Sequence, residues 1–121
     1  MKKREYGCGM EAALDVIGGK WKVLVLWHLS AGPRRFGELR RQVTGISEKM
    51  LIQQLREMAA DGIVARKDYR EIPPRVEYSL TAFGVSLREA LRPLCEWGAT
   101  HMERIGARKG GGETEVAAPC R

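Results

Sequence analysis

Residues 47–78 constrain the fold of this chain most, because they combine the signals of a capped helix with those of a β-hairpin directly behind it. Ser47 is a strong N-cap residue, since its hydroxyl can accept a hydrogen bond from an early N–H of the helix. Gly62, which follows Asp61, is a typical stop signal at the other end. We therefore predict a helix over residues 48–61.

The predicted helix has two different faces. At about 3.6 residues per turn, its apolar side chains fall on one stripe. These are Leu51, Leu55 and Met58. The opposite face carries Lys49, Gln53 and Arg56 beside Met50. The apolar stripe suits a core, whereas the polar face is either a solvated helix surface or a surface that reads another molecule.

Two segments with strand character follow the helix, at residues 63–70 and 76–80. The second alternates apolar and polar residues, which is typical of a strand with one buried face. Pro73 and Pro74 have no backbone N–H to donate, so they belong in the loop between the strands. Three basic residues lie on or beside this loop: Lys67, Arg70 and Arg75. They are either edge charges that discourage aggregation or the contacts of a wing along a DNA backbone, and the preceding helix favours the wing.

The rest of the chain predicts four more helices. One is a short amphipathic helix at residues 10–17, and residues 20–30 are apolar nearly all round, which indicates a buried central helix. A short extended piece at residues 34–36 and a brief helix at residues 37–43 then lead through Gly45 into the capped helix. Two short helices joined by such a turn are the helix-turn-helix signature.

Thr81 caps a last long helix, which Pro93 should kink or divide. Its apolar stripe consists of Phe83, Leu87, Leu91, Leu94, Trp97 and Ile105. The stripe packs either on its own domain or on the same helix of a second copy. We favour a second copy, because a helix-turn-helix protein gains affinity for palindromic DNA from two half-sites. The predicted fold class is mainly α with a small β-hairpin (α+β): a winged helix-turn-helix with flanking dimerisation helices.

Composition limits the class of protein further. The 121 residues suit one domain, and no apolar run approaches the roughly 18 residues of a membrane span, so we expect no membrane partner. The formal charge is +6, and residues 20–80 hold 12 basic and 7 acidic residues. Such an excess either attracts phosphate or keeps a protein soluble. Three widely spaced cysteines argue against a secreted disulfide framework and predict a cytoplasmic location.

Catalysis has little support, and we predict no enzyme, no cofactor and no metal site. The two histidines, His28 and His101, and the three cysteines show no ligand spacing such as Cys-x-x-Cys. There is no glycine-rich phosphate loop either. Two kinds of function remain. The first is a sequence-specific regulator that binds double-stranded DNA, and the second is a winged-helix module that binds protein or RNA and binds DNA without sequence preference.

Ordered motifs over about residues 8–102 resemble a known family. Cys8 is followed by EAALDVIGGKWKVLVLWHLSAGPRRFGELRR and then by GISEKMLIQQLREMAADGIVARKDYREIPPRVEYSLTAFG. The chain resembles the HxlR-type winged helix-turn-helix transcriptional regulators of bacteria, which are relatives of the MarR superfamily. The resemblance implies a homodimeric repressor or activator. In it, the helix at Glu48 enters the major groove, the hairpin is the wing, and the terminal helices form the dimer interface.

These expectations assign roles to particular residues. Base contacts are expected from Ser47, Lys49, Met50, Gln53 and Arg56. Phosphate and wing contacts are expected from Arg34, Arg35, Lys67, Arg70 and Arg75. The dimer interface is expected to include Met10, Leu14, Leu87, Leu91, Leu94 and Trp97.

The resemblance also implies a sensor. The family's characteristic N-terminal cysteine matches Cys8 and responds to oxidants or electrophiles in several members. The positive end of the helix at residues 10–17 would stabilise a thiolate there. Resolving cysteines that some members carry near the recognition helix have no counterpart in this chain. The alternative is a small-molecule effector in a cavity between dimer helices. Trp21, Trp27 and Trp97 either line this cavity or belong to an ordinary core.

The expected domain organisation has three parts. Residues 1–7 form a flexible arm, residues 8–107 form the HxlR-type winged helix-turn-helix domain with its terminal dimerisation helices, and residues 108–121 form a disordered tail that begins near a run of glycines.

Overall fold

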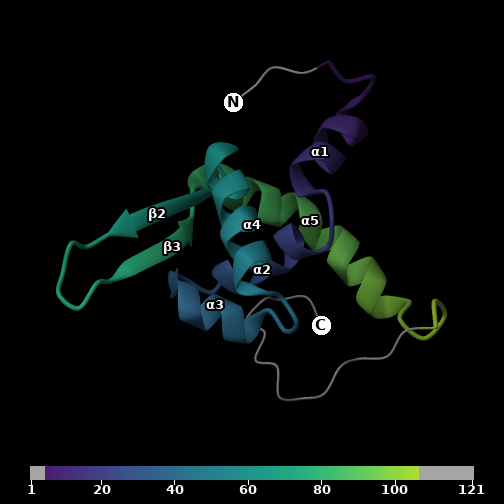
Figure 1. Ribbon diagram of the computed structural model, residues 1–121. Helices are drawn as coiled ribbons and strands as arrows, with labels where there is room; N and C mark the ends of the chain where they lie inside the picture. The colour runs from purple at the N-terminus through teal and green to yellow at the C-terminus, as the bar shows by residue number, and fades with distance from the viewer. Residues whose placement is uncertain (1–4, 107–121) are drawn as a thin grey trace.

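The computed structural model describes residues 5–106, and the predicted tail with Cys120 lies outside the described residues. Five helices and three strands follow one another along these described residues (Figure 1). In order they are α1 (Gly9–Ile17), α2 (Trp21–Leu29), β1 (Arg34–Arg35), α3 (Phe36–Gln42), α4 (Glu48–Ala60), β2 (Val64–Asp68), β3 (Val76–Leu80) and α5 (Ala82–Thr100). The predicted helix-turn-helix therefore consists of α3 and α4, and the predicted hairpin of β2 and β3.

The core is built around α2, as the apolar sequence of this helix predicts. Residues 25–29 of α2 are all buried, and the predicted inner stripe of α4 packs with them. The buried residues of that stripe are Leu51, Leu55 and Met58. Its polar face therefore points away from the core, which is the condition for contact with another molecule.

The ends of α4 follow the predicted signals. The Ser47 hydroxyl accepts a hydrogen bond from the Met50 N–H at 3.1 Å, which satisfies one of the unpaired donors of the first turn. The helix ends at Ala60 with Asp61 as its C-cap. Gly62 follows with φ +78°, a left-handed conformation that glycine adopts without steric cost.

The sheet has one strand more than the sequence predicts. Its strand order is β1-β3-β2, antiparallel throughout, and Arg34 of the short extended piece pairs with Tyr78. Phe36 is the first residue of α3 rather than part of this strand. A strand of two residues is too short to show an alternating pattern, so the sequence predicts its extended backbone but not its partner. The pairing fixes the root of the hairpin next to α3.

The hairpin is also attached to the start of α5. The backbone N–H of Thr81 donates to the Ile63 carbonyl at 3.0 Å, and the Thr81 hydroxyl donates to the carbonyls of Gly62 and Ile63. A Cβ on Gly84 would lie 2.2 Å from the Ile63 carbonyl oxygen. Only glycine permits this approach, so the end of α4, the root of β2 and the first turn of α5 form one rigid junction.

Of the two outcomes predicted at Pro93, a kink or a division of the last helix, the division does not occur. The helix α5 continues through Pro93 to Thr100, while Ile105 lies beyond its end. Proline removes one intrahelical hydrogen bond. However, Leu91 is buried and Cys95 packs against the core, so tertiary contacts hold both sides of the proline in one helix.

Apolar side chains remain exposed on the two terminal helices. Met10 and Leu14 of α1 and Leu94 and Trp97 of α5 are each more than half exposed. Both α1 and the C-terminal half of α5 lie on the side of the molecule opposite to the hairpin (Figure 1). No described helix is long and apolar enough to cross a membrane.

Two of the residues predicted for the interface also contact the core of their own protomer. Leu91 is buried in the core of its own protomer, and Leu87 packs against that core. Both lie on the side of α5 that faces the core. The apolar stripe of a long helix can contain core residues as well as exposed residues, and the sequence pattern does not distinguish between them.

Candidate nucleic-acid interface

The exposed face of α4 carries most of the side chains predicted to read bases. Lys49, Gln53 and Arg56 are all exposed. Ile52 lies on the same face and is 40% exposed, although no motif in the sequence marks it as a functional residue. Within the described part of the chain, neither Lys49 nor Arg56 forms an ion pair. Their charges are therefore available to an external partner.

Met50 does not belong with these residues. It is half-buried and packs against the core, and its sulfur accepts a hydrogen bond from the Gln54 amide at 3.2 Å. A methionine at the edge of the apolar stripe bends into the gap beside the core because its side chain is flexible and polarisable. Ser47 stays exposed, but its hydroxyl serves the helix cap.

Gln53 is held by a polar contact within α4. Its Nε2 donates to Glu57 Oε2 at 3.1 Å, while Glu57 Oε1 lies 2.7 Å from Lys22 Nζ of α2. The hydrogen bond from Lys22, followed by that from Gln53, lowers the pKa of Glu57 below its ordinary value. The exposed face of α4 is thus linked to the central helix through a carboxylate that stays charged.

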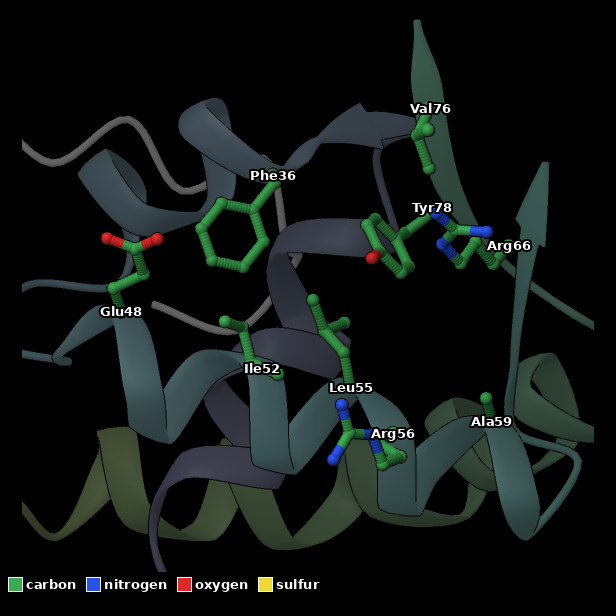
Figure 2. A pocket seen from close by; sticks show the side chains of 9 residues that line it. All are labelled: Phe36, Glu48, Ile52, Leu55, Arg56, Ala59, Arg66, Val76 and Tyr78. Atoms are coloured by element: carbon green, nitrogen blue, oxygen red, sulfur yellow. The ribbon is translucent and has the colours of Figure 1, made fainter. Parts of the chain in front are cut away.

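A hollow of about 620 Å³ lies between α4 and the sheet (Figure 2). Phe36 and Tyr78 face one another across it, above Ile52 and Leu55, and Arg56 and Arg66 lie at its edge. The remaining lining residues are Glu48, Ala59 and Val76. Arg66 is not among the residues predicted from the sequence. The feature that places it at this hollow is the strand register, which pairs Arg66 with Tyr78.

The outer part of the hairpin is organised around Tyr69, another residue that no sequence motif marks as functional. The Arg75 guanidinium lies 3.7 Å and the Lys67 ammonium 4.6 Å from the centre of its ring. The Tyr69 hydroxyl donates to Glu77 at 2.9 Å. Cation–π contacts of this kind hold both basic groups at the hairpin.

Two arginines of the hairpin region, Arg70 and Arg75, differ in their exposure to solvent. Arg70 is exposed, with φ +56°, and its N–H donates to Asp68 at 2.8 Å. Arg75 is half-buried and lies 3.8 Å from Glu71. Arg70 is therefore more accessible than Arg75.

The two arginines of β1 lie on the same sheet as the hairpin. Arg35 is exposed, and its backbone N–H donates to Glu38 at 2.7 Å. Arg34 is half-buried, with one guanidinium N–H donated to the Pro33 carbonyl at 3.1 Å. Burial, reinforced by the charge of Arg34, lowers the pKa of His28 from its ordinary value of 6.5.

Cys8 is the N-cap residue of α1 and a free, exposed thiol. Its backbone carbonyl accepts the Ala12 N–H at 3.3 Å. The position is the one expected from the sequence, at the positive end of a helix dipole. The other described cysteine, Cys95, packs against the core.

The described residues contain no group of three or more His, Cys, Asp or Glu side chains that could hold a metal ion.

Comparison with known proteins places this architecture among transcriptional regulators. Residues 16–106 match the family model described as HxlR-like helix-turn-helix. The uncharacterised HTH-type transcriptional regulator YtcD of Bacillus subtilis is 50% identical over 105 residues, which are 87% of this chain and 83% of that protein.

Two solved structures of regulators are similar over most of their length. The redox regulator HypR in its reduced form aligns with a TM-score of 0.78 and 45% identity, covering 82% of this chain and 98% of that chain. The reduced form of the transcriptional regulator YodB from B. subtilis aligns with a TM-score of 0.71 and 33% identity, covering 82% and 98%.

Proposed function

Because this chain belongs to the HxlR-like helix-turn-helix family of DNA-binding transcriptional regulators, we propose that it acts in the cytoplasm as a homodimer on an inverted repeat. Each α4 enters a major groove, and each hairpin lies along the adjacent backbone. The observation that supports this most directly is that α4 and the hairpin are neighbours (Figure 1), with an exposed polar face on α4 and exposed basic side chains on the hairpin.

The side chains proposed to contact DNA divide into two roles. Lys49, Gln53 and Arg56 contact base edges, with Ser47 at the margin of the contact. The phosphate contacts come from Arg34, Arg35, Lys67, Arg70 and Arg75. Base contacts determine sequence preference, and phosphate contacts determine overall affinity and its salt dependence.

The dimer interface is formed by the apolar surface of α1 and α5. This surface includes four apolar side chains that are more than half exposed in a single protomer: Met10, Leu14, Leu94 and Trp97. An isologous contact between two copies would bury these side chains on both protomers. This arrangement places both α4 helices at a distance set by the terminal helices.

Regulation acts through the same terminal helices. The structural relatives include a redox regulator, HypR, and Cys8 of this chain is an exposed free thiol at the start of α1. Oxidation or alkylation of Cys8 changes the packing of α1 in the dimer and so changes the separation of the α4 helices. A small-molecule effector between the terminal helices is the alternative trigger.

Selection of binding sites from random DNA tests the function directly. The expected result is an enriched inverted repeat with half-site centres about 34 Å apart or a multiple of this. Weak binding without any enriched sequence would instead support a winged-helix module for protein or RNA.

A further inference from the structure

Gln53 is the only one of the three proposed base-reading side chains for which the described residues show a side-chain hydrogen bond. Its partner Glu57 lies one helical turn further along α4, and the second oxygen of that carboxylate is taken by Lys22 of α2. We infer that Glu57, held in place by Lys22, is a positioning residue that fixes the amide of Gln53 for the recognition of adenine. This inference rests on the proposed function.

The hydrogen bond determines which way the amide faces. A glutamine amide has one acceptor oxygen and two N–H donors, whereas a carboxylate only accepts. The Gln53 Nε2 is therefore on the side of Glu57, and its Oε1 is on the other side of the amide. One N–H and the oxygen remain for an external partner.

This pair of groups matches one base edge in the major groove. Adenine presents the N7 acceptor and the N6 amino donor side by side, and glutamine pairs with both. Guanine presents two acceptors, N7 and O6, so a fixed amide would place its oxygen against O6. A mobile amide could instead turn its NH₂ group toward guanine. By fixing the amide, Glu57 therefore lowers the affinity for guanine as well as raising the affinity for adenine.

Lys22 connects the carboxylate to the rigid part of the fold. Its side chain is only 14% exposed, compared with 43% for Glu57, and it extends from the central helix α2. Lys22 lines a hollow together with Glu57, Asp15 of α1 and Asp61. Without Lys22, the Glu57 side chain would keep several rotamers and would hold Gln53 less well.

The test measures base preference rather than affinity alone. The operator is selected from random DNA with the parent protein, and the adenine whose preference Gln53→Ala abolishes is identified. Affinities are then measured for duplexes that carry adenine, guanine or 7-deazaadenine at this position. The parent protein should lose about tenfold in affinity for guanine, the effect of one lost bidentate contact. It should lose less for 7-deazaadenine, which lacks the N7 acceptor but keeps the N6 amino group.

The variants separate positioning from stability. In Glu57→Ala the adenine-to-guanine ratio should fall toward one, and the cost of 7-deazaadenine should fall with it. Lys22→Met should lower the ratio in part, and Lys22→Arg should restore it, since it keeps the charge and the hydrogen bond. A general loss of folding reduces the affinity for all three duplexes together, so it leaves the ratio unchanged.

Glu48→Gln is the matched control. It removes a carboxylate from the same helix, where Glu48 pairs with Arg40 and not with Gln53. It should raise affinity for all duplexes alike, because less negative charge faces the DNA, and it should keep the parent ratio.

The outcomes distinguish this inference from the proposed function. If Gln53→Ala abolishes the preference but Glu57→Ala keeps the parent ratio, the positioning role is overturned and the DNA-binding function stands. If Gln53→Ala alters no position of the consensus, the positioning role is overturned together with the assignment of Gln53. If the parent enriches no sequence at all, the proposed function itself fails.

Discussion

At the scale of single residues, Gly84 has the closest approach to another atom among the described glycines. Its missing side chain lets the first turn of α5 approach the Ile63 carbonyl, where a Cβ would lie 2.2 Å from the oxygen. This carbonyl cannot easily move away from a Cβ at residue 84, because it also accepts the hydrogen bond from the Thr81 backbone N–H. The residue thus connects the position of the last helix to the root of the hairpin.

We expect Gly84→Ala to destabilise the protein by about 1–3 kcal/mol, the usual cost of overpacking a filled site. Chemical unfolding measures this. Gly98→Ala is the control on the same helix, because a Cβ there meets nothing within 4 Å, and it should stabilise by up to about 1 kcal/mol. Equal effects of the two substitutions would contradict the close approach.

Cys8 should determine the response to oxidants and quinone-like electrophiles. Treatment with diamide or a quinone is expected to change operator affinity about tenfold, which needs only about 1.4 kcal/mol of coupling between α1 and the α4 helices. Cys8→Ser should bind the operator normally and lose the response, as measured by fluorescence anisotropy.

A protein that keeps only Cys8, made by Cys95→Ser together with Cys120→Ser, should still respond. If Cys8→Ser responds like the parent protein, the trigger is not this thiol, and a non-covalent ligand between the terminal helices becomes the better explanation.

At the scale of elements, the hairpin and α4 should differ in how they act on DNA. Arg70→Ala removes an exposed charge from the hairpin, so the slope of log K against log salt should fall by about 0.9 with an unchanged consensus. Arg92→Ala removes the same charge from α5, where it pairs with Glu89, and should leave the slope as it is. A changed consensus for Arg70→Ala would mean that the hairpin reads bases.

The central helix should make stability depend on pH. The pKa of His28 is lowered by burial and by Arg34, so the unfolded chain binds a proton that the folded chain does not. This contribution to stability is fully present above pH 6.5, the ordinary pKa, and is lost as the pH falls through the lower folded pKa.

Urea unfolding at pH 7.5 and 5.5 measures the effect. His28→Leu should reduce the loss of unfolding free energy between these two values, and Arg34→Gln should reduce it in part, because one of the two causes of the shift is removed. A parent protein whose stability is constant over this range would contradict the buried neutral histidine.

At the scale of the whole molecule, the exposed apolar surface of α1 and α5 should control oligomeric state and operator affinity together. Leu94→Glu places a charge on this surface, so sedimentation should show a monomer whose operator affinity is reduced at least about tenfold, since the second half-site no longer contributes. Phe83→Glu is the control. It lies at the other end of α5, is also more than half exposed, and should stay dimeric.

A parent monomer at micromolar concentration that still selects a palindrome would contradict the dimer. The same experiment with Leu94→Glu separates folding from assembly, because circular dichroism reports the helices of the protomer whether or not it dimerises.

The sequence by itself determined the elements that depend on local chemistry. The N-cap at Ser47, the stop at Gly62 and the apolar stripe of α4 are signals within a few residues, and the structure follows them closely. The strand at residues 76–80 is likewise observed with the predicted bounds, because alternation and flanking prolines are local as well.

Only the tertiary structure decided which apolar and polar side chains meet. The burial of Leu91, the inward position of Met50, the pairing of β1 and the continuity of α5 through Pro93 depend on contacts between segments far apart in the chain. The link from Lys22 to Glu57 spans 35 positions and two helices. Helical periodicity places each side chain on a face of its own helix, but the neighbour on that face is set by how the helices pack, and no local pattern contains that information.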